Sequence, residues 1–143
     1  SGSGEPAADL LVKASRLHGV EIGGEEIPSL IDEIPVIAAA ACFADGVTVI
    51  RDAAELKVKE SNRIAAMTEN LRAMGADVTE TEDGMIIRGG RPLHGAVIDS
   101  RNDHRIAMTF AVAALAAEGE TSIPQWDCVN ISYPGFLEDL RKL

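Results

Sequence analysis

The sequence predicts an α/β fold made of repeated βαβαββ units, with about one and two-thirds units in its 143 residues. Two observations predict this fold. Short apolar segments typical of strands alternate along the chain with segments of helical period. In addition, three short sequences recur in the same order about 70 residues later. Such self-similarity indicates repeated supersecondary units that share one core.

The composition is that of a globular chain with few aromatic residues. Hydrophobic residues make up 46% of the chain and aromatic residues 3%, so the core must consist of Ala, Val, Ile, Leu and Met side chains. The formal net charge of -10 argues against a nucleic-acid partner, because binding to phosphates needs a broad basic surface. No apolar run approaches the ~20 residues that span a bilayer, so no membrane partner is expected.

The two cysteines indicate a reducing compartment. Cys42 and Cys128 stand in apolar surroundings and are too few for a disulfide framework. We therefore expect a cytoplasmic location. The sequence has neither metal-ligand spacing nor a Gly-rich phosphate loop, so no metal and no cofactor are predicted.

The first unit is assigned to residues 8–90 and begins with strands and an Ala-rich helix. Strands are expected at residues 10–14, 20–22 and 47–51, and the helix at residues 31–44. Acidic residues in the first turn of this helix suit the positive end of its dipole. A glycine follows its end, where helices often stop.

The rest of the first unit is predicted to be a helix followed by a hairpin. Four apolar residues fall on one face of a helix at residues 61–74: Ile64, Met67, Leu71 and Met74. Strands are expected at residues 76–81 and 85–88. The Glu-Asp-Gly sequence between them ends in a dipeptide that favours a tight turn.

The second unit, residues 91–143, is predicted to be incomplete. Strands are expected at residues 95–98 and 121–123, and helices at residues 103–117 and 134–143. This unit lacks a closing hairpin, and the unpaired sheet edge that results is a liability. We therefore infer that the missing strands come from another segment of a longer parent chain or from another molecule.

Charged residues gather at the predicted helix starts. The first start carries Asp32 and Glu33, which either compensate the helix dipole or include a base; Glu33 is expected to point elsewhere on the helix. The next start carries Lys59, Glu60 and Arg63. A carboxylate between two cations is suited to proton transfer, and the cations can bind phosphate or carboxylate. The alternative is a capped, solvated run of charges.

The third helix start carries Arg105 after the sequence Asn-Asp-His. Asp103 is expected to cap the helix, and His104 by itself is more often a packed or surface residue than a catalyst. In the internal repeat, Asp32 corresponds to Arg105. If the two units are related by pseudosymmetry, these helix starts converge on one pocket and present a carboxylate beside a guanidinium.

These clusters resemble motifs of the 5-enolpyruvylshikimate-3-phosphate synthase family. The motifs are Asp-Glu-Ile-Pro at residues 32–35, Lys-Glu-Ser-Asn-Arg at residues 59–63 and Asn-Asp-His-Arg at residues 102–105. The likeness extends over residues 8–143 and implies an enolpyruvyl transferase-like fold and the C-terminal third of a longer enzyme. Residues 1–7 are then interpreted as a flexible leader or a cloning remnant.

The resemblance also implies a reaction and roles. Family members transfer the enolpyruvyl group of phosphoenolpyruvate to the 5-hydroxyl of shikimate 3-phosphate and release phosphate, a step of the shikimate pathway of aromatic amino-acid biosynthesis. Asp32 and Glu60 would be catalytic. Asp32 and Lys59 would bind shikimate 3-phosphate, and Arg63 and Arg105 would bind phosphoenolpyruvate.

The resemblance further marks two outer positions and one departure. His104 and Glu55 are expected to support the site from its edge. Ile131 stands where many members carry a lysine that meets phosphoenolpyruvate, and we interpret it as the mark of a subfamily. Because the family's N-terminal half supplies contacts to shikimate 3-phosphate and further contacts to phosphoenolpyruvate, the chain alone is expected to lack turnover. Its expected partner is the N-terminal part of the parent enzyme.

Two other functions stay open from the sequence. A UDP-N-acetylglucosamine enolpyruvyl transferase-like enzyme would share the fold and phosphoenolpyruvate, although the Asn-Asp-His-Arg set argues against it. A non-catalytic domain that binds anions, or that completes another chain, would also carry charged helix starts.

Overall fold

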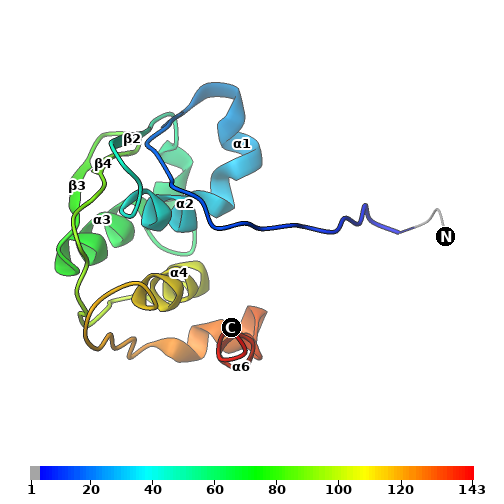
Figure 1. Ribbon diagram of the computed structural model, residues 1–143. Helices are drawn as coiled ribbons and strands as arrows, with labels where there is room; N and C mark the ends of the chain where they lie inside the picture. The colour runs from blue at the N-terminus through cyan, green and yellow to red at the C-terminus, as the bar shows by residue number, and fades with distance from the viewer. Residues whose placement is uncertain (1–3) are drawn as a thin grey trace.

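The computed structural model describes residues 4–143 and has a small sheet with helices packed against it (Figure 1). The sheet has four strands in the order β1-β2-β4-β3. They are β1 (Glu21–Ile22), β2 (Val47–Ile50), β3 (Asp77–Glu80) and β4 (Met85–Arg88). β1 runs parallel to β2, whereas β4 runs antiparallel to both β2 and β3. The predicted hairpin is therefore confirmed, and β4 is its inner strand.

The main helices form layers on the sheet. Helices α2 (Ile34–Ala41) and α3 (Arg63–Ala73) pack against the strands, and α4 (His104–Ala114) packs on both helices. The C-terminal helices α5 (Val129–Ser132) and α6 (Phe136–Leu140) lie beyond α4 in Figure 1. No helix in residues 4–143 is long and apolar enough to cross a membrane. The predicted α/β class is confirmed.

Short helical turns connect these elements. They are η1 (Gly24–Glu26), α1 (Ile27–Leu30), η2 (Ile31–Glu33), η3 (Ala54–Val58) and η4 (Trp126–Cys128). The predicted helix at residues 31–44 thus begins as a 3-10 turn and becomes α-helical only at Ile34, with a proline in its first turn. Proline fits there because the first helical N–H groups have no partner inside the helix.

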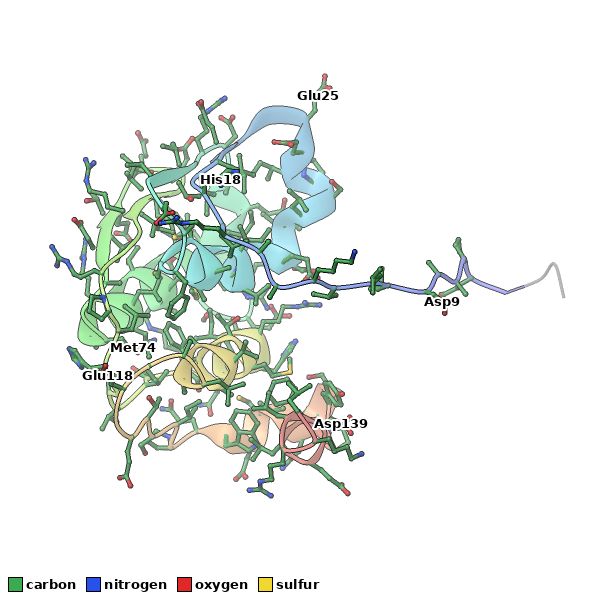
Figure 2. The ribbon with its side chains drawn as sticks, in the orientation of Figure 1. Asp9, His18, Glu25, Met74, Glu118 and Asp139 are labelled. Atoms are coloured by element: carbon green, nitrogen blue, oxygen red, sulfur yellow. The ribbon has the colours of Figure 1, made fainter. Side chains whose placement is uncertain are left out.

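The strand predicted at residues 10–14 is wrong. This segment has no regular structure, and the side chain of Leu10 is 88% exposed. Figure 2 shows Asp9 on a stretch that runs away from the body of the molecule. An apolar run forms a strand only when another strand pairs with it, and no other described segment lies alongside this one. Of the predicted leader at residues 1–7, residues 1–3 lie outside the described part of the chain.

The two predicted strands of the second unit are reduced to single bridges. Residues 95–98 and 121–123 form no named strand, but His94 bridges Glu118 and Val97 bridges Ser122, both in parallel. Val97 is 72% exposed. In the second unit the sheet therefore consists only of two segments joined by isolated bridges.

Backbone geometry confirms the internal repeat. The bridge between His18 and Asp45 in the first unit matches the bridge between His94 and Glu118 in the second. The glycine after each of these acidic partners has a positive φ, +88° at Gly46 and +82° at Gly119. Only glycine adopts this conformation without strain. Equivalent turns therefore follow α2 and α4.

One aliphatic core joins the two units. The predicted helix face is buried in full: Ile64, Met67, Leu71 and Met74 are each 0% exposed. The core also takes in residues of α2, the sheet and α4, among them Ile34, Ile87 and Phe110. The fully buried Phe110 shows that the expectation of a core without aromatic side chains is wrong at this position. A smaller cluster of Ala107, Cys128 and Val129 joins the C-terminal segment to α4. This shared packing fixes the starts of α2, α3 and α4 relative to one another.

Candidate functional site

Arg63, the first residue of α3, lies at the centre of the polar site, and its side chain is only 1% exposed. Its Nη1 donates to Asp32 at 3.2 Å and its Nη2 to Glu60 at 2.6 Å. Its Nε and Nη2 donate to the two oxygens of Asp103 at 2.8 and 3.2 Å. A guanidinium has five N–H donors. Four of them are therefore engaged with carboxylates.

Asp103 is the N-cap of α4 and is fully buried. One of its oxygens accepts from Ser61 Oγ at 2.8 Å as well as from Arg63 Nε. The other accepts from the backbone N–H of Arg105 at 3.0 Å and from Arg63 Nη2. The predicted cap is confirmed, and the same carboxylate also binds Arg63 in a bidentate pair.

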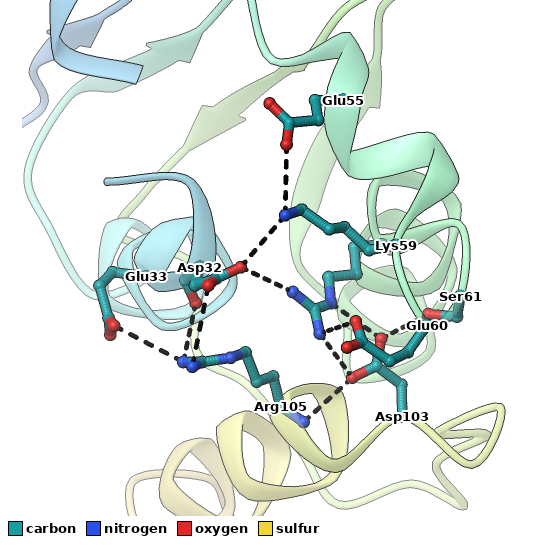
Figure 3. Close-up of polar contacts among 9 residues, drawn as sticks. Asp32, Glu33, Glu55, Lys59, Glu60, Ser61, Asp103 and Arg105 are labelled. Carbon is teal, nitrogen blue, oxygen red and sulfur yellow. Dashed lines mark hydrogen bonds and ion pairs between the residues drawn. The ribbon is translucent and has the colours of Figure 1, made fainter. Parts of the chain in front are cut away.

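Asp32 joins the three predicted helix starts (Figure 3). Its carboxylate lies 3.2 Å from Arg63 Nη1, 3.6 Å from Lys59 Nζ and 3.9 Å from Arg105 Nη2. Lys59 is also 3.3 Å from Glu55, one helical turn away. The charged starts of α2, α3 and α4 therefore meet at one place, as the repeat predicts.

Arg105 is the more open of the two arginines, with 35% of its side chain exposed. Its Nη1 lies 3.5 Å from Glu33 and 3.4 Å from the backbone oxygen of Asp32. The expectation that Glu33 points elsewhere is therefore wrong. Both acidic side chains of the 3-10 turn at residues 31–33 therefore lie within 4 Å of Arg105 on α4.

His104 is the one predicted site residue that this network does not include. It is half-buried at the start of α4. Within residues 4–143, no hydrogen bond or ion pair joins it to the charged cluster. All other predicted site residues contact at least one member of the cluster: Asp32, Glu55, Lys59, Glu60, Arg63 and Arg105.

Two residues of the site had no functional prediction. Asp103 was expected only as a cap, and Ser61 was not singled out for a role in the site. In the structure the Asp103 carboxylate accepts hydrogen bonds from both Arg63 and Ser61, which links the two residues to the charged cluster. The cap pattern is a local signal. The partner that gives Asp103 its second role is Arg63, which stands 40 residues away in the sequence.

Burial and pairing oppose each other in the Arg63–Asp103 pair. Burial by itself would raise the pKa of Asp103, but hydrogen bonds from Arg63 and Ser61 outweigh it and leave this pKa below its ordinary value. Burial would likewise lower the pKa of Arg63, but Asp103, Glu60 and Asp32 leave it raised. Both groups are therefore charged at neutral pH, and each depends on the other.

The whole cluster is net negative. It holds the cations Lys59, Arg63 and Arg105 and the carboxylates of Asp32, Glu33, Glu55, Glu60 and Asp103. A pocket of about 200 Å³ lies beside Arg105 and is lined on its other side by apolar residues such as Val36 and Met108. The charged side chains that line this pocket are Arg105, Asp32 and Glu33.

Comparison with known proteins gives one consistent result. The family model described as EPSP synthase (3-phosphoshikimate 1-carboxyvinyltransferase) matches residues 3–140. A 3-phosphoshikimate 1-carboxyvinyltransferase of Thermoanaerobacter sp. (strain X514) is 63% identical over 139 residues, which are 97% of this chain and 33% of the relative. One of Synechococcus sp. (strain JA-3-3Ab) is 59% identical over 141 residues, 99% of this chain and 32% of the relative.

A solved structure agrees with the sequence matches. EPSP synthase from Acinetobacter baumannii superposes with a TM-score of 0.85 at 42% identity, over 89% of this chain and 30% of that one. The enolpyruvyl transferase-like fold predicted from the motifs is therefore confirmed. The chain spans about a third of the length of the curated relatives that it matches.

Proposed function

Because the chain belongs to the EPSP synthase family, we propose that it is part of an enzyme that makes 5-enolpyruvylshikimate 3-phosphate. The reaction transfers the enolpyruvyl group of phosphoenolpyruvate to the 5-hydroxyl of shikimate 3-phosphate and releases phosphate. The observation that carries this proposal is the meeting of three helix starts at Asp32, which contacts Lys59, Arg63 and Arg105. A cytoplasmic location is part of the same proposal.

Two carboxylates are assigned the proton transfers. The reaction must remove a proton from a hydroxyl, deliver one to the enolpyruvyl methylene carbon and later remove one from the resulting methyl group. Asp32 and Glu60 are 45% and 54% exposed and stand on opposite sides of Arg63. Asp32 would face the hydroxyl of shikimate 3-phosphate, with Lys59 holding this substrate, and Glu60 would act at the enolpyruvyl carbon.

The two arginines are assigned to phosphoenolpyruvate in unequal ways. Arg105 lines the pocket, and its contacts to Asp32 and Glu33 are longer than ordinary hydrogen bonds, so an anion can replace them. Four of the five N–H donors of Arg63 pair with carboxylates, and the fifth, on Nη1, has no partner within residues 4–143. It would therefore offer phosphoenolpyruvate one hydrogen bond while it keeps the carboxylates in place.

The partner proposed for this site is the N-terminal part of the parent enzyme. The net negative cluster needs cations from elsewhere before a phosphate ester binds. The second unit also has an open edge. β2 pairs with β4 on the side away from β1. The matching segment of the second unit, residues 120–122, instead lines an open hollow with Ala96 and Val97, and Thr121 Oγ1 is buried without a hydrogen-bond partner in residues 4–143. A strand from the parent chain would pair with this edge.

Activity of the complete parent enzyme tests the proposal. We expect phosphate release when shikimate 3-phosphate and phosphoenolpyruvate are both present, and none with UDP-N-acetylglucosamine in place of shikimate 3-phosphate. Turnover with UDP-N-acetylglucosamine would favour the related enolpyruvyl transferase reaction. Binding of both anions without turnover in the complete chain would favour a non-catalytic domain.

A further inference from the structure

We propose that Asp103 is a positioning residue of the site, and this inference rests on the function proposed above. By holding the Arg63 guanidinium in one orientation, Asp103 fixes where Arg63 places the carboxylates of Asp32 and Glu60. These are the two groups to which the proton transfers are assigned. Asp103 does not itself face the pocket, since it is fully buried.

The hydrogen bonds of Asp103 leave it one orientation. Each of its oxygens accepts two hydrogen bonds, from Ser61 Oγ and Arg63 Nε on one side and from Arg63 Nη2 and the Arg105 N–H on the other. The distances run from 2.8 to 3.2 Å. A bidentate arginine–carboxylate pair fixes the plane of both groups. The plane of the Arg63 guanidinium is therefore fixed while Asp103 is in place.

The terminal nitrogens of the same guanidinium contact the two carboxylates to which the proton transfers are assigned. Arg63 Nη1 donates to Asp32 at 3.2 Å, and Nη2 donates to Glu60 at 2.6 Å. Both carboxylates are about half exposed. Lys59 and Arg105 also lie 3.6 and 3.9 Å from Asp32, but within residues 4–143 Arg63 is the one buried side chain paired with either carboxylate. Their places thus follow from the orientation that Asp103 imposes on Arg63.

The backbone turn before Asp103 has an unusual conformation. Arg101 and Asn102 both have positive φ, 55° and 56°, a conformation that L residues rarely adopt. Such strain gathers at functional sites, where the surrounding structure maintains it. The turn is anchored by the Asp103 N–H, which donates to the Ser100 carbonyl at 3.0 Å, and by the Ser100 N–H, which donates to Gln125 at 3.1 Å.

Asn62, the side-chain cap of α3, has neither a strained backbone nor, within the described part of the chain, a bidentate pair with an arginine. Asn62 caps α3 with a single hydrogen bond from the Ala65 N–H, and its φ of −72° is ordinary. Asn62 contacts no guanidinium within residues 4–143. A cap alone therefore explains neither the full burial of Asp103 nor its bidentate pair, whereas a positioning role explains both.

The test uses the complete parent enzyme with the substitution Asp103→Asn. The amide keeps one oxygen acceptor but cannot form the bidentate ionic pair. A displacement of catalytic groups by about 1 Å can cost about 10²-fold in rate, so we expect kcat per folded molecule to fall about 10- to 100-fold. KM for shikimate 3-phosphate should change less than about threefold, because the Lys59 side chain proposed to hold this substrate is paired with Asp32 and Glu55 and not with Asp103. The folded fraction is measured by circular dichroism.

Two further variants keep the test decisive. Ser61→Ala removes one hydrogen bond to Asp103 and leaves no buried charge unpaired, so it should lower kcat in the same direction but less. Glu69→Gln removes an ion pair to Arg101 on the turn before Asp103 but none of the hydrogen bonds to the Asp103 carboxylate, and should leave kcat unchanged.

The outcomes separate this inference from the proposed function. If the unaltered parent does not convert the two substrates, the proposed function fails. If the parent is active but Asp103→Asn keeps kcat per folded molecule within about twofold, the positioning role is overturned. If Asp103→Asn does not fold, Ser61→Ala decides: a normal kcat makes Asp103 merely structural and overturns the proposal, and a lowered kcat supports it.

Discussion

The starts of α3 and α4 each carry an arginine next to acidic side chains, yet the two regions differ in burial. Arg63 is 1% exposed and donates four hydrogen bonds to carboxylates, all within 3.2 Å. Arg105 is 35% exposed, and its side-chain contacts to acidic residues are between 3.4 and 3.9 Å. The same residue type therefore organises the site in one region and faces a ligand pocket in the other.

The largest expected effect comes from the carboxylates that Arg63 holds. In the parent enzyme, Asp32→Asn or Glu60→Gln should lower kcat by about 10²–10⁴-fold, the usual contribution of a positioned acid or base, with little change in KM. Glu33 contacts only Arg105 among the cations of the cluster, so Glu33→Gln is the matched control and should be much milder. Steady-state kinetics measure all three. Equal losses at Glu33 and Asp32 would refute the roles assigned here.

Stability should separate the two arginines next. Arg63→Gln leaves Asp103 buried without its ionic partner, and breaking a buried pair costs about 3–5 kcal/mol. Arg105→Gln removes partly exposed contacts that contribute about 0–1 kcal/mol. Urea unfolding of the parent chain and both variants measures the difference. Similar losses in the two variants would mean that burial does not distinguish these regions.

Arg105, whose loss should affect stability least, should have a clear effect on phosphoenolpyruvate binding. Arg105→Lys keeps the positive charge but loses the planar fork that binds a carboxylate or phosphate with two hydrogen bonds. The loss of one charge-assisted hydrogen bond of about 1.5–3 kcal/mol should raise KM for phosphoenolpyruvate by about tenfold or more. Initial-rate measurements at varied phosphoenolpyruvate check this expectation. An unchanged KM together with an unchanged kcat would remove Arg105 from the binding site.

The smallest effect concerns pH. The pKa of Asp103 in the folded protein lies below its ordinary value of 3.8, so its pairing stabilises the fold at any pH above that value. This stability is lost as pH falls through the lowered folded-state pKa. The difference in unfolding free energy between the parent and Asp103→Asn should therefore shrink from pH 7 toward pH 3. Urea unfolding across this range tests it, and a constant difference would contradict the ionic pair.

The elements that the sequence predicted correctly depend on local signals. Helix α3 follows from the spacing of Ile64, Met67 and Leu71, and the hairpin follows from its Asp-Gly turn. The strand predicted at residues 10–14 is wrong because strand formation depends on a partner elsewhere in the chain. The second role of Asp103 was missed for the same reason, since Arg63 reaches it from a different helix.

The meeting of the charged helix starts was predictable from the internal repeat, whereas the roles of their side chains stay predictions. The correspondence of Asp32 to Arg105 in the two units places a carboxylate and a guanidinium at equivalent helix starts, and the structure brings them within 3.9 Å. The contact of Glu33 with Arg105 was not predicted, because it depends on how the starts of α2 and α4 pack against each other, and Arg105 stands far from Glu33 in the sequence.

The central claim is that residues 4–143 hold one side of a two-sided site, and complementation tests it most directly. The chain is mixed with a separately produced N-terminal part of the parent enzyme, and phosphate release from shikimate 3-phosphate and phosphoenolpyruvate is measured. We expect negligible turnover from either part and clear turnover from the mixture, because both sides are needed to orient the substrates and exclude water. Robust phosphate release by the 143-residue chain alone would contradict the account.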